Sequence, residues 1–265
     1  MKTKDEANEN VTSYAAPALD KGLDILELLC RTTRPISQKE IAKSINRSVG
    51  ELYRMLNCLV RRDYVSQIDD TYVLSTKLFQ MAHTNPPTHR LLVEAQPIMD
   101  KLAIDLDQSC HLSVWNSGKQ VVVAKVDVPG MMGFSVRVGS DLDAVISASG
   151  RVLMAFQTDR VRAARLAQAL ERRPLQNDPE IEAKLKRIRK RGYESARSVQ
   201  VRGLHAVAFP ILDFEGHALA ALTVPYAERI DQDERKSIDE VIHALGEATN
   251  LLTQRLGGHV TIDEG

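Results

Sequence analysis

The stretch Ser37–Arg62, SQKEIAKSINRSVGELYRMLNCLVRR, decides the fold of the first part of this chain. Ser37 is followed three residues later by Glu40, a pattern typical of a capping box, in which the two side chains bind backbone N–H groups at a helix start. A second helix start lies at Ser48, directly after a turn at Asn46-Arg47. The spacing therefore predicts two short consecutive helices joined by a tight turn.

The flanking segments complete the pattern around these two helices. From Pro17 to Cys30, apolar residues recur at helical spacing and predict one further helix. Residues 64–74 contain two β-branched and aromatic runs around an Asp-Asp-Thr turn, which predict a hairpin. Three helices followed by a hairpin are typical of a winged helix-turn-helix, in which the third helix can enter the major groove of DNA.

Positive charge is concentrated in the same segment. The whole chain is neutral, with 35 basic and 35 acidic residues, which argues against a polybasic protein. Neutralisation of phosphates supplies most of the non-specific affinity for DNA, so a local excess of basic residues favours DNA binding. Charge alone would fit a solvated helix face equally well, and the order of the elements favours the DNA interface. Residues 31–62 contain two acidic residues and eight basic ones: Arg31, Arg34, Lys39, Lys43, Arg47, Arg54, Arg61 and Arg62.

The helix after Ser48 carries the candidate base-reading side chains. Arg54 is suited to a guanine edge and Asn57 to an adenine edge. Glu51 either accepts a hydrogen bond from a cytosine amine or acts as a favourable charge at the helix N-terminus, and the second interpretation is favoured. The expected DNA-binding residues, of which the first three are placed for phosphates, are Ser37, Gln38, Arg47, Ser48, Val49, Gly50, Glu51, Tyr53, Arg54 and Asn57.

The second half of the chain predicts an α+β domain. Residues 75–107 are expected to be mainly helical, with a break at Asn85-Pro86-Pro87. Antiparallel hairpins with helices between them then predict one sheet covered by helices. The expected strands are 110–116, 119–127, 134–138, 204–213 and 217–225, and the expected helices are 147–157, 159–171, 178–191 and 231–256.

These elements predict five consecutive segments. We expect a disordered tail over 1–16, a winged helix-turn-helix domain over 17–80, a linker helix over 81–107, an α+β domain over 108–257 and a flexible tail over 258–265.

Composition places the chain in the cytoplasm. The N-terminus is polar and lacks the apolar core of a signal peptide. No run of about 18 apolar residues is present, so we expect no membrane association. The three cysteines, Cys30, Cys58 and Cys110, are odd in number and far apart, as expected for reduced thiols.

Nothing in the sequence predicts an enzyme, a metal site or a cofactor. No nucleophile elbow, phosphate-binding loop or zinc-protease motif is present. His111, His205 and His217 are interpreted as satisfied or exposed histidines rather than metal ligands. A redox sensor built on Cys110 is a weaker alternative, because no second cysteine stands nearby in the sequence to form a disulfide.

The segment Ser147-Ala148-Ser149-Gly150 has two interpretations that the sequence does not separate. It is a helix N-terminus that binds an anion with help from Arg151. Alternatively, Ser147 simply caps the helix that follows.

Taken in order, five segments of the chain and its long last helix resemble the IclR family of transcriptional regulators over residues 17–256. The spacing of the segments carries the resemblance, since no single one is specific. They are ALDKGLDILELL (18–29), ISQKEIAKSINRSVGELYRMLNCLVRRDYV (36–65), YVLSTKLFQMA (72–82), VGSDLDAVISASGRVLMAF (138–156) and IRKRGYESARSVQVRGLHAVAFPILDFEGHALAALTVPY (188–226).

The resemblance implies a ligand-responsive DNA-binding regulator, in most cases a repressor of catabolic genes. Family members are homodimers or homotetramers that bind palindromic operators on double-stranded DNA. Their C-terminal domain has a GAF-like fold and binds a small organic acid or an aromatic compound. By motif, the effector-binding residues here are Ala148, Ser149, Gly150, Ala196, Leu204, Ala206, Thr223 and Pro225.

The chain departs from the family pattern within that pocket. Members that bind small carboxylates tend to have an acid at the position of Ala196, a cysteine at that of Ala206, and serines at those of Thr223 and Pro225. A buried polar group without a partner costs about 1–3 kcal/mol, so fewer polar groups suit a less polar ligand. We therefore expect an effector with a substantial apolar or aromatic part.

Overall fold

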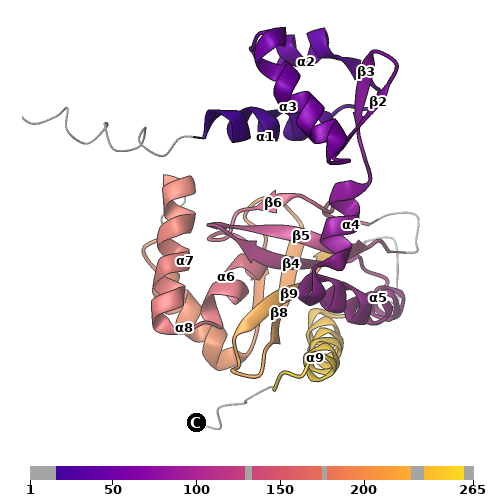
Figure 1. The fold of residues 1–265 in the computed structure, drawn as a ribbon. Coiled ribbons are helices and arrows are strands. Elements are labelled where there is room, and N and C mark those ends of the chain that lie inside the picture. The colour runs from indigo at the N-terminus through magenta and orange to yellow at the C-terminus, as the bar shows by residue number, and fades with distance from the viewer. Residues whose placement is uncertain (1–15, 129–132, 175–177, 228–235, 260–265) are drawn as a thin grey trace, which may run out of the picture. The chain divides into compact units, whose positions relative to one another are not determined.

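A computed structural model describes residues 16–128, 133–174, 178–227 and 236–259 of the chain (Figure 1). Of the tails predicted over 1–16 and 258–265, residues 1–15 and 260–265 lie outside these described residues. The chain divides into two compact units, Met1–Pro86 and Pro87–Gly265. No helix in the described ranges is long and apolar enough to cross a membrane.

The N-terminal unit is a winged helix-turn-helix. Its three strands form an antiparallel sheet in the order β1-β3-β2, so β1 joins the hairpin that the sequence predicts. Ile25, Ile41, Leu52 and Leu56 are fully buried between the helices and this sheet. The elements are α1 (Pro17–Leu29), β1 (Ile36–Ser37), α2 (Gln38–Ser44), α3 (Val49–Arg61), β2 (Val65–Ile68), β3 (Thr71–Leu74) and α4 (Lys77–Thr84).

Both helices of the helix-turn-helix start with a complete capping box. The Ser37 hydroxyl accepts the Glu40 N–H, and the Glu40 carboxylate accepts the Ser37 N–H. Ser48 and Glu51 repeat the arrangement at the start of α3. Asn46 makes the turn between α2 and α3 with a positive φ of 53°, a conformation that asparagine tolerates better than most residues. The predicted helix starts are confirmed.

The C-terminal unit is an α+β domain built on one antiparallel sheet of six strands, in the order β6-β5-β4-β9-β8-β7. The elements are α5 (Pro86–Leu106), β4 (Cys110–Asn116), β5 (Lys119–Val126), β6 (Asp141–Leu142), α6 (Ala148–Ala155), α7 (Asp159–Arg172), α8 (Ile181–Arg191), β7 (Glu194–Arg197), β8 (Leu204–Leu212), β9 (Ala218–Ala227) and α9 (Ile238–Arg255).

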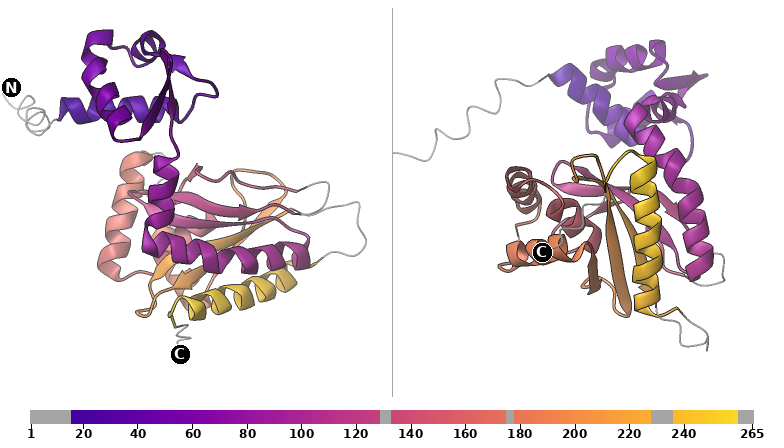
Figure 2. Two further views of the ribbon diagram at one scale, coloured as in Figure 1. Left: turned by 45° about the vertical axis from the view of Figure 1, so that its right-hand side comes forward. Right: turned by 90° about the horizontal axis from the view of Figure 1, so that it is seen from below.

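Helices cover both faces of this sheet. Figure 2 shows α5 and α9 side by side on one face and α6, α7 and α8 on the other. Side chains alternate between the faces: Leu112 and Leu222 are paired across β4 and β9 and pack in the α5/α9 core. The neighbouring pair, His111 and Thr223, shares the opposite face.

The structure corrects some of the predicted elements and confirms others. Residues 134–138 alternate apolar and polar residues but form no strand, because the chain reaches the edge of the sheet only at Gly139 and Ser140, through bonds to Val122. The short strands β6 and β7 were not among the predicted elements. The predicted break at Asn85-Pro86-Pro87 is confirmed, because α4 ends at Thr84 and α5 begins at Pro86, and proline is well tolerated in the first turn of a helix. At the end, Gly258 is still buried and donates its N–H to the Thr253 carbonyl.

Gly150 fixes the position of α6 on the domain. A Cβ atom at this position would lie 2.3 Å from the Ala144 carbonyl oxygen and 2.4 Å from the Ala144 Cα. The helix therefore approaches the segment before it more closely than any other residue would allow.

We expect Gly150→Ala to destabilise the C-terminal unit by about 1–3 kcal/mol, because an added methyl group must displace backbone. Fluorescence of Trp115, the single tryptophan, reports urea unfolding of this unit. Gly22→Ala on α1, where a Cβ meets nothing within 4 Å, is the matched control and should leave the Trp115 transition unchanged. Equal urea midpoints for the parent and Gly150→Ala would contradict the close contact.

Candidate functional site

The outer face of α3 is a candidate DNA interface. Leu52 and Leu56 are buried and hold the helix on its domain. On the opposite side Val49 and Tyr53 keep 41% and 58% of their surface exposed. The side chains of Arg47, Arg54 and Asn57 are also exposed. This face combines cations, an amide and apolar groups that can reach base edges and thymine methyl groups.

Four of the predicted DNA-binding residues have positioning roles within the unit. The Ser48 N–H, the Lys21 ammonium and the Ser48 hydroxyl hold the pKa of Glu51 at about 2. Its carboxylate lies 2.9 Å from the Lys21 Nζ and completes the capping box at the start of α3. The Ser37 hydroxyl donates a hydrogen bond to the Glu40 carboxylate at the start of α2. The Gln38 amide donates to the Val49 carbonyl at 3.2 Å and ties α2 to α3.

A cavity of about 290 Å³ lies on the α6 side of the large sheet. Seven of the eight predicted effector-binding residues line it: Ala148, Ser149, Ala196, Leu204, Ala206, Thr223 and Pro225. Gly150 does not line it and packs against Ala144 instead. Much of the wall comes from the loop residues 134–137, from Arg197 at the end of β7 and from Ser198, Gln200 and Val201 after it, and motif-based prediction missed all of these.

The charge of the cavity wall is one-sided. Arg137, Arg151 and Arg197 line the cavity, and no aspartate or glutamate does so among the described residues. Arg151 is already occupied: its guanidinium lies 2.8 Å from Glu194 and donates to the carbonyls of Val145 and Ile146. The exposed Arg137 and Arg197 therefore remain to receive an anion.

The start of α6 follows the capping interpretation. The Ser147 hydroxyl accepts the Gly150 N–H at 3.2 Å, and Ser147 itself donates to the Asp143 carbonyl. Because Arg151 is bound to Glu194, it does not assist an anion at this helix start. The segment therefore shapes the cavity wall as a capped helix.

His111 is buried without a hydrogen-bond partner, contrary to the expectation of a satisfied or exposed histidine. It is 3% exposed, and both ring nitrogens lack a partner within the described part of the chain. The Thr223 hydroxyl, on the paired residue of β9, is buried and unpartnered too. Burial lowers the pKa of His111 to about 4, so the imidazole is neutral at physiological pH.

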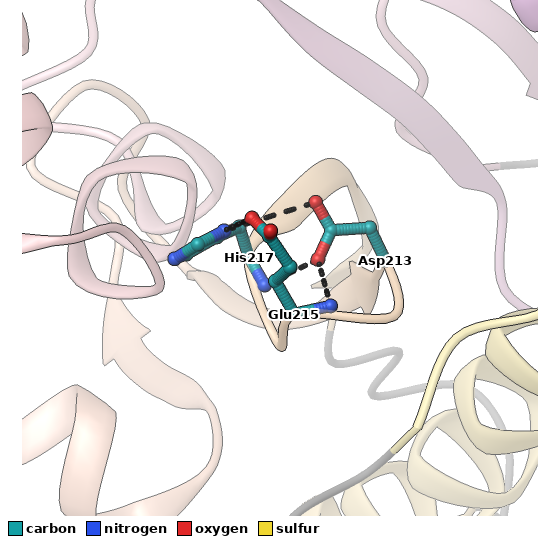
Figure 3. A group of neighbouring side chains, drawn as sticks. All are labelled: Asp213, Glu215 and His217. Carbon is teal, nitrogen blue, oxygen red and sulfur yellow. Dashed lines mark hydrogen bonds and ion pairs between the residues drawn. The ribbon is translucent and has the colours of Figure 1, made fainter.

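The other two histidines are engaged elsewhere. The His205 Nε2 lies 2.8 Å from the Ser195 hydroxyl, between β8 and β7. His217 lies with Asp213 and Glu215 in the turn between β8 and β9, and ligand atoms of the three side chains come within 4.8 Å of one another (Figure 3). Asp213 Oδ1 accepts the N–H groups of Glu215 and His217 at 2.9 and 2.8 Å. These hydrogen bonds close the turn and explain why the three side chains lie together.

Cys110 lacks the properties of a redox sensor. Burial raises the pKa of its thiol to about 12, so the reactive thiolate is suppressed. The thiol donates weakly to the Met99 carbonyl at 3.6 Å beneath α5.

Two family models match the chain and together cover both units. The model described as "Bacterial transcriptional regulator IclR C-terminal" matches residues 87–250, which is more than half of the chain, and "IclR helix-turn-helix domain" matches residues 18–69. The chain belongs to the IclR family. It is a ligand-responsive, DNA-binding transcriptional regulator and not an enzyme. The predicted fold class is confirmed as well.

Individual IclR relatives are distant but extend over most of the chain. The Pca regulon regulatory protein of Pseudomonas putida is 25% identical over 212 residues, 78% of this chain and 73% of its own. The repressor AllR of Salmonella typhi is 24% identical over 241 residues, 88% and 89% of the two chains. An IclR homologue from Microbacterium hydrocarbonoxydans, solved in complex with 4-hydroxybenzoate, has a TM-score of 0.72 at 18% identity and covers 91% and 99%.

The buried His111 makes the stability of this IclR effector domain depend on pH. Because its pKa is 6.5 ordinarily and about 4 when folded, the unfolded chain binds a proton between these values that the folded domain does not. The free energy of unfolding therefore falls as pH falls below 6.5, by about 2 kcal/mol at pH 5 from this residue, and is unaffected above pH 7. Urea unfolding of the parent and His111→Gln at pH 7.5 and 5 measures it. If the free energy of unfolding falls equally in the two proteins between pH 7.5 and pH 5, the assignment of this pH dependence to His111 is refuted.

Proposed function

We propose that this regulator is a repressor of catabolic genes, acts in the cytoplasm, and is released from its operator by a small organic or aromatic acid. The proposal rests on one observation. The same chain holds an exposed face on α3 that can contact DNA bases and a partly apolar cavity with a cationic rim. AllR is named as a repressor, and a structural neighbour holds 4-hydroxybenzoate, which supports both halves of the proposal.

We assign the DNA contacts by the exposure of the side chains. Arg54 reads a guanine and Asn57 an adenine, while Val49 and Tyr53 pack against base edges. Arg47, in the turn before α3, binds phosphate. Ser48 and Glu51 hold the first turn of α3 in place, and Gly50 leaves it free of a side chain where the backbone approaches DNA.

We propose that the regulator acts as a homodimer or homotetramer on a palindromic operator. Two recognition helices then have to match half-sites about 34–36 Å apart, or a multiple of that spacing. The effector releases DNA if it binds one arrangement of subunits better than the other. The helix α5 carries the change between effector domain and DNA-binding domain, as the linker helix expected at 81–107.

The arginines of the helix-turn-helix should differ in their effect on DNA binding. We expect Arg54→Ala to cost about 1–3 kcal/mol of discrimination between operator and mutated operator, because it removes a base contact. Arg47→Ala should weaken binding to all duplexes and reduce the salt dependence by about one counterion. Titrations of the DNA upstream of the protein's own gene at several salt concentrations measure both.

Lys186→Ala on α8 is the charge-matched control for these titrations, since Lys186 is an exposed cation of the effector domain. It should leave operator affinity and the salt slope unchanged. If all three variants bind like the parent at low salt, α3 is not the reading element.

The cavity should bind small acids and thereby stabilise the effector domain. A ligand at 100 times its Kd raises the free energy of unfolding by about 2.7 kcal/mol, so a thermal-shift screen of aromatic and aliphatic acids identifies binders. Ala206→Leu fills the cavity floor and should abolish the shift. An acid that binds yet leaves operator affinity unaltered would contradict release by effector.

A further inference from the structure

We infer that the paired residues His111 and Thr223 together bind one hydroxyl group of the effector at the closed end of the cavity, and that the effector is a hydroxylated aromatic or apolar acid whose carboxylate lies at the arginine rim. This inference rests on the proposed function of the cavity as an effector site. It adds His111, which lies outside the motif-derived residues, and a second polar group on the ligand.

His111 and Thr223 carry buried polar groups that no described residue binds. His111 and Thr223 both line the cavity, and the two nitrogens of His111 and the hydroxyl of Thr223 are buried without a hydrogen-bond partner among the described residues. The residues are opposite each other on β4 and β9, so their side chains share one face of the sheet. Buried polar groups are almost always hydrogen-bonded in the functional state. Two neighbouring residues whose buried polar groups lack a partner therefore indicate that a ligand group binds there.

These polar groups suit a particular kind of ligand group. A neutral imidazole offers one donor and one acceptor, and a threonine hydroxyl offers the same pair of roles. A ligand hydroxyl both donates and accepts, so it can bond both residues at once. A carboxylate at this end would be buried without a free cation, because the Arg151 guanidinium is bound to Glu194 and no other cation lines the closed end within the described ranges.

The cavity wall gives the direction of the ligand. His111 and Thr223 are 3% and 2% exposed, whereas Arg137 and Arg197 are exposed, so the cavity runs from a neutral closed end to a cationic rim. Apolar residues make up much of the remaining lining, among them Leu142, Ile146, Ala196, Leu204, Ala206 and Pro225. A volume of about 290 Å³ is at the small end of ligand pockets, which suits a single ring or a short chain.

Matched pairs of acids test this inference by titration calorimetry on the full chain. The probes are 4-hydroxybenzoate with benzoate, and 4-hydroxyphenylacetate with phenylacetate. We expect the hydroxylated member of at least one pair to bind about 10- to 100-fold more tightly, since the analogue leaves both orphans unbonded. Equal affinities within both pairs would overturn the inference, and so would the absence of binding by all four acids.

Variants separate the two ends of the cavity. Thr223→Val and His111→Leu should bring the affinity ratio within a pair close to one, while Arg197→Gln should weaken both members equally and keep the ratio. Thr249→Val is the matched control, because its hydroxyl is bonded to the Leu245 and Gly246 carbonyls on the other side of the sheet. It should leave the ratio unchanged. A ratio that persists in both Thr223→Val and His111→Leu would overturn the assignment.

Two further measurements distinguish a failure of this inference from a folding defect and from a failure of the proposed function. Thr223→Val removes a hydroxyl that has no partner, so the unliganded variant should unfold at the same urea concentration as the parent or higher. A clear loss of stability would instead indicate a structural role for Thr223. Operator binding, and its release by any other acid from the wider screen, tests the regulator itself. If that release occurs while the pairs show no preference, this inference fails and the proposed function stands.

Discussion

The pairing of β4 with β9 is the contact on which the effector domain depends. It joins the β4–β5 hairpin to the β7-β8-β9 strands, two parts that are about one hundred residues apart in the chain. The register places Leu112 opposite Leu222 in the α5/α9 core, and His111 opposite Thr223 on the cavity face. Because side chains alternate, a slip of one residue would move leucines into the cavity and polar groups into the core. The core therefore enforces the arrangement of the binding site.

Hydrogen bonds around one aspartate set the cavity wall. Asp143 is buried, and its Oδ1 accepts the N–H groups of Val145 and Ile146 at 2.9 and 3.2 Å. Its Oδ2 has no hydrogen bond but lies 3.5 Å from the Arg173 guanidinium, an ion pair that meets its charge. Gln120 donates to the Asp143 carbonyl and to the Ser147 hydroxyl, linking β5 to the start of α6. The wall is thus rigid where α6 begins.

Local signals in the sequence predicted most of the fold. The capping serines at 37 and 48, the Asp-Asp-Thr hairpin and the helical periodicity each act over a few residues, and all were recognisable. The strands β1 and β6 contain two residues each, and only their partners make them strands. Residues 134–138 had an alternating pattern without a partner, so the pattern misled.

Only those cavity residues that lie in motifs shared with the IclR family could be predicted from the sequence. The floor residues on β8 and β9 and at the start of α6 were expected from the family resemblance. His111 was not, because its meaning depends on Thr223, more than a hundred positions away, and on a register that no local pattern encodes. Arg137 lies in a loop and Arg197 at the end of the edge strand β7, and at such exposed positions composition alone does not distinguish a ligand contact from a solvated cation.

The buried side and the exposed side of α3 have separate roles. Its buried leucines and capping box maintain the fold, while no hydrogen bond or ion pair among the described residues involves the side chains of Val49, Tyr53, Arg54 and Asn57. Exposed substitutions away from such structural features usually change stability by no more than about 0.5 kcal/mol. With the DNA contacts proposed for these side chains, substitutions among them would change which operators the protein recognises at little cost in stability, so a new target need not await a compensating change in the core.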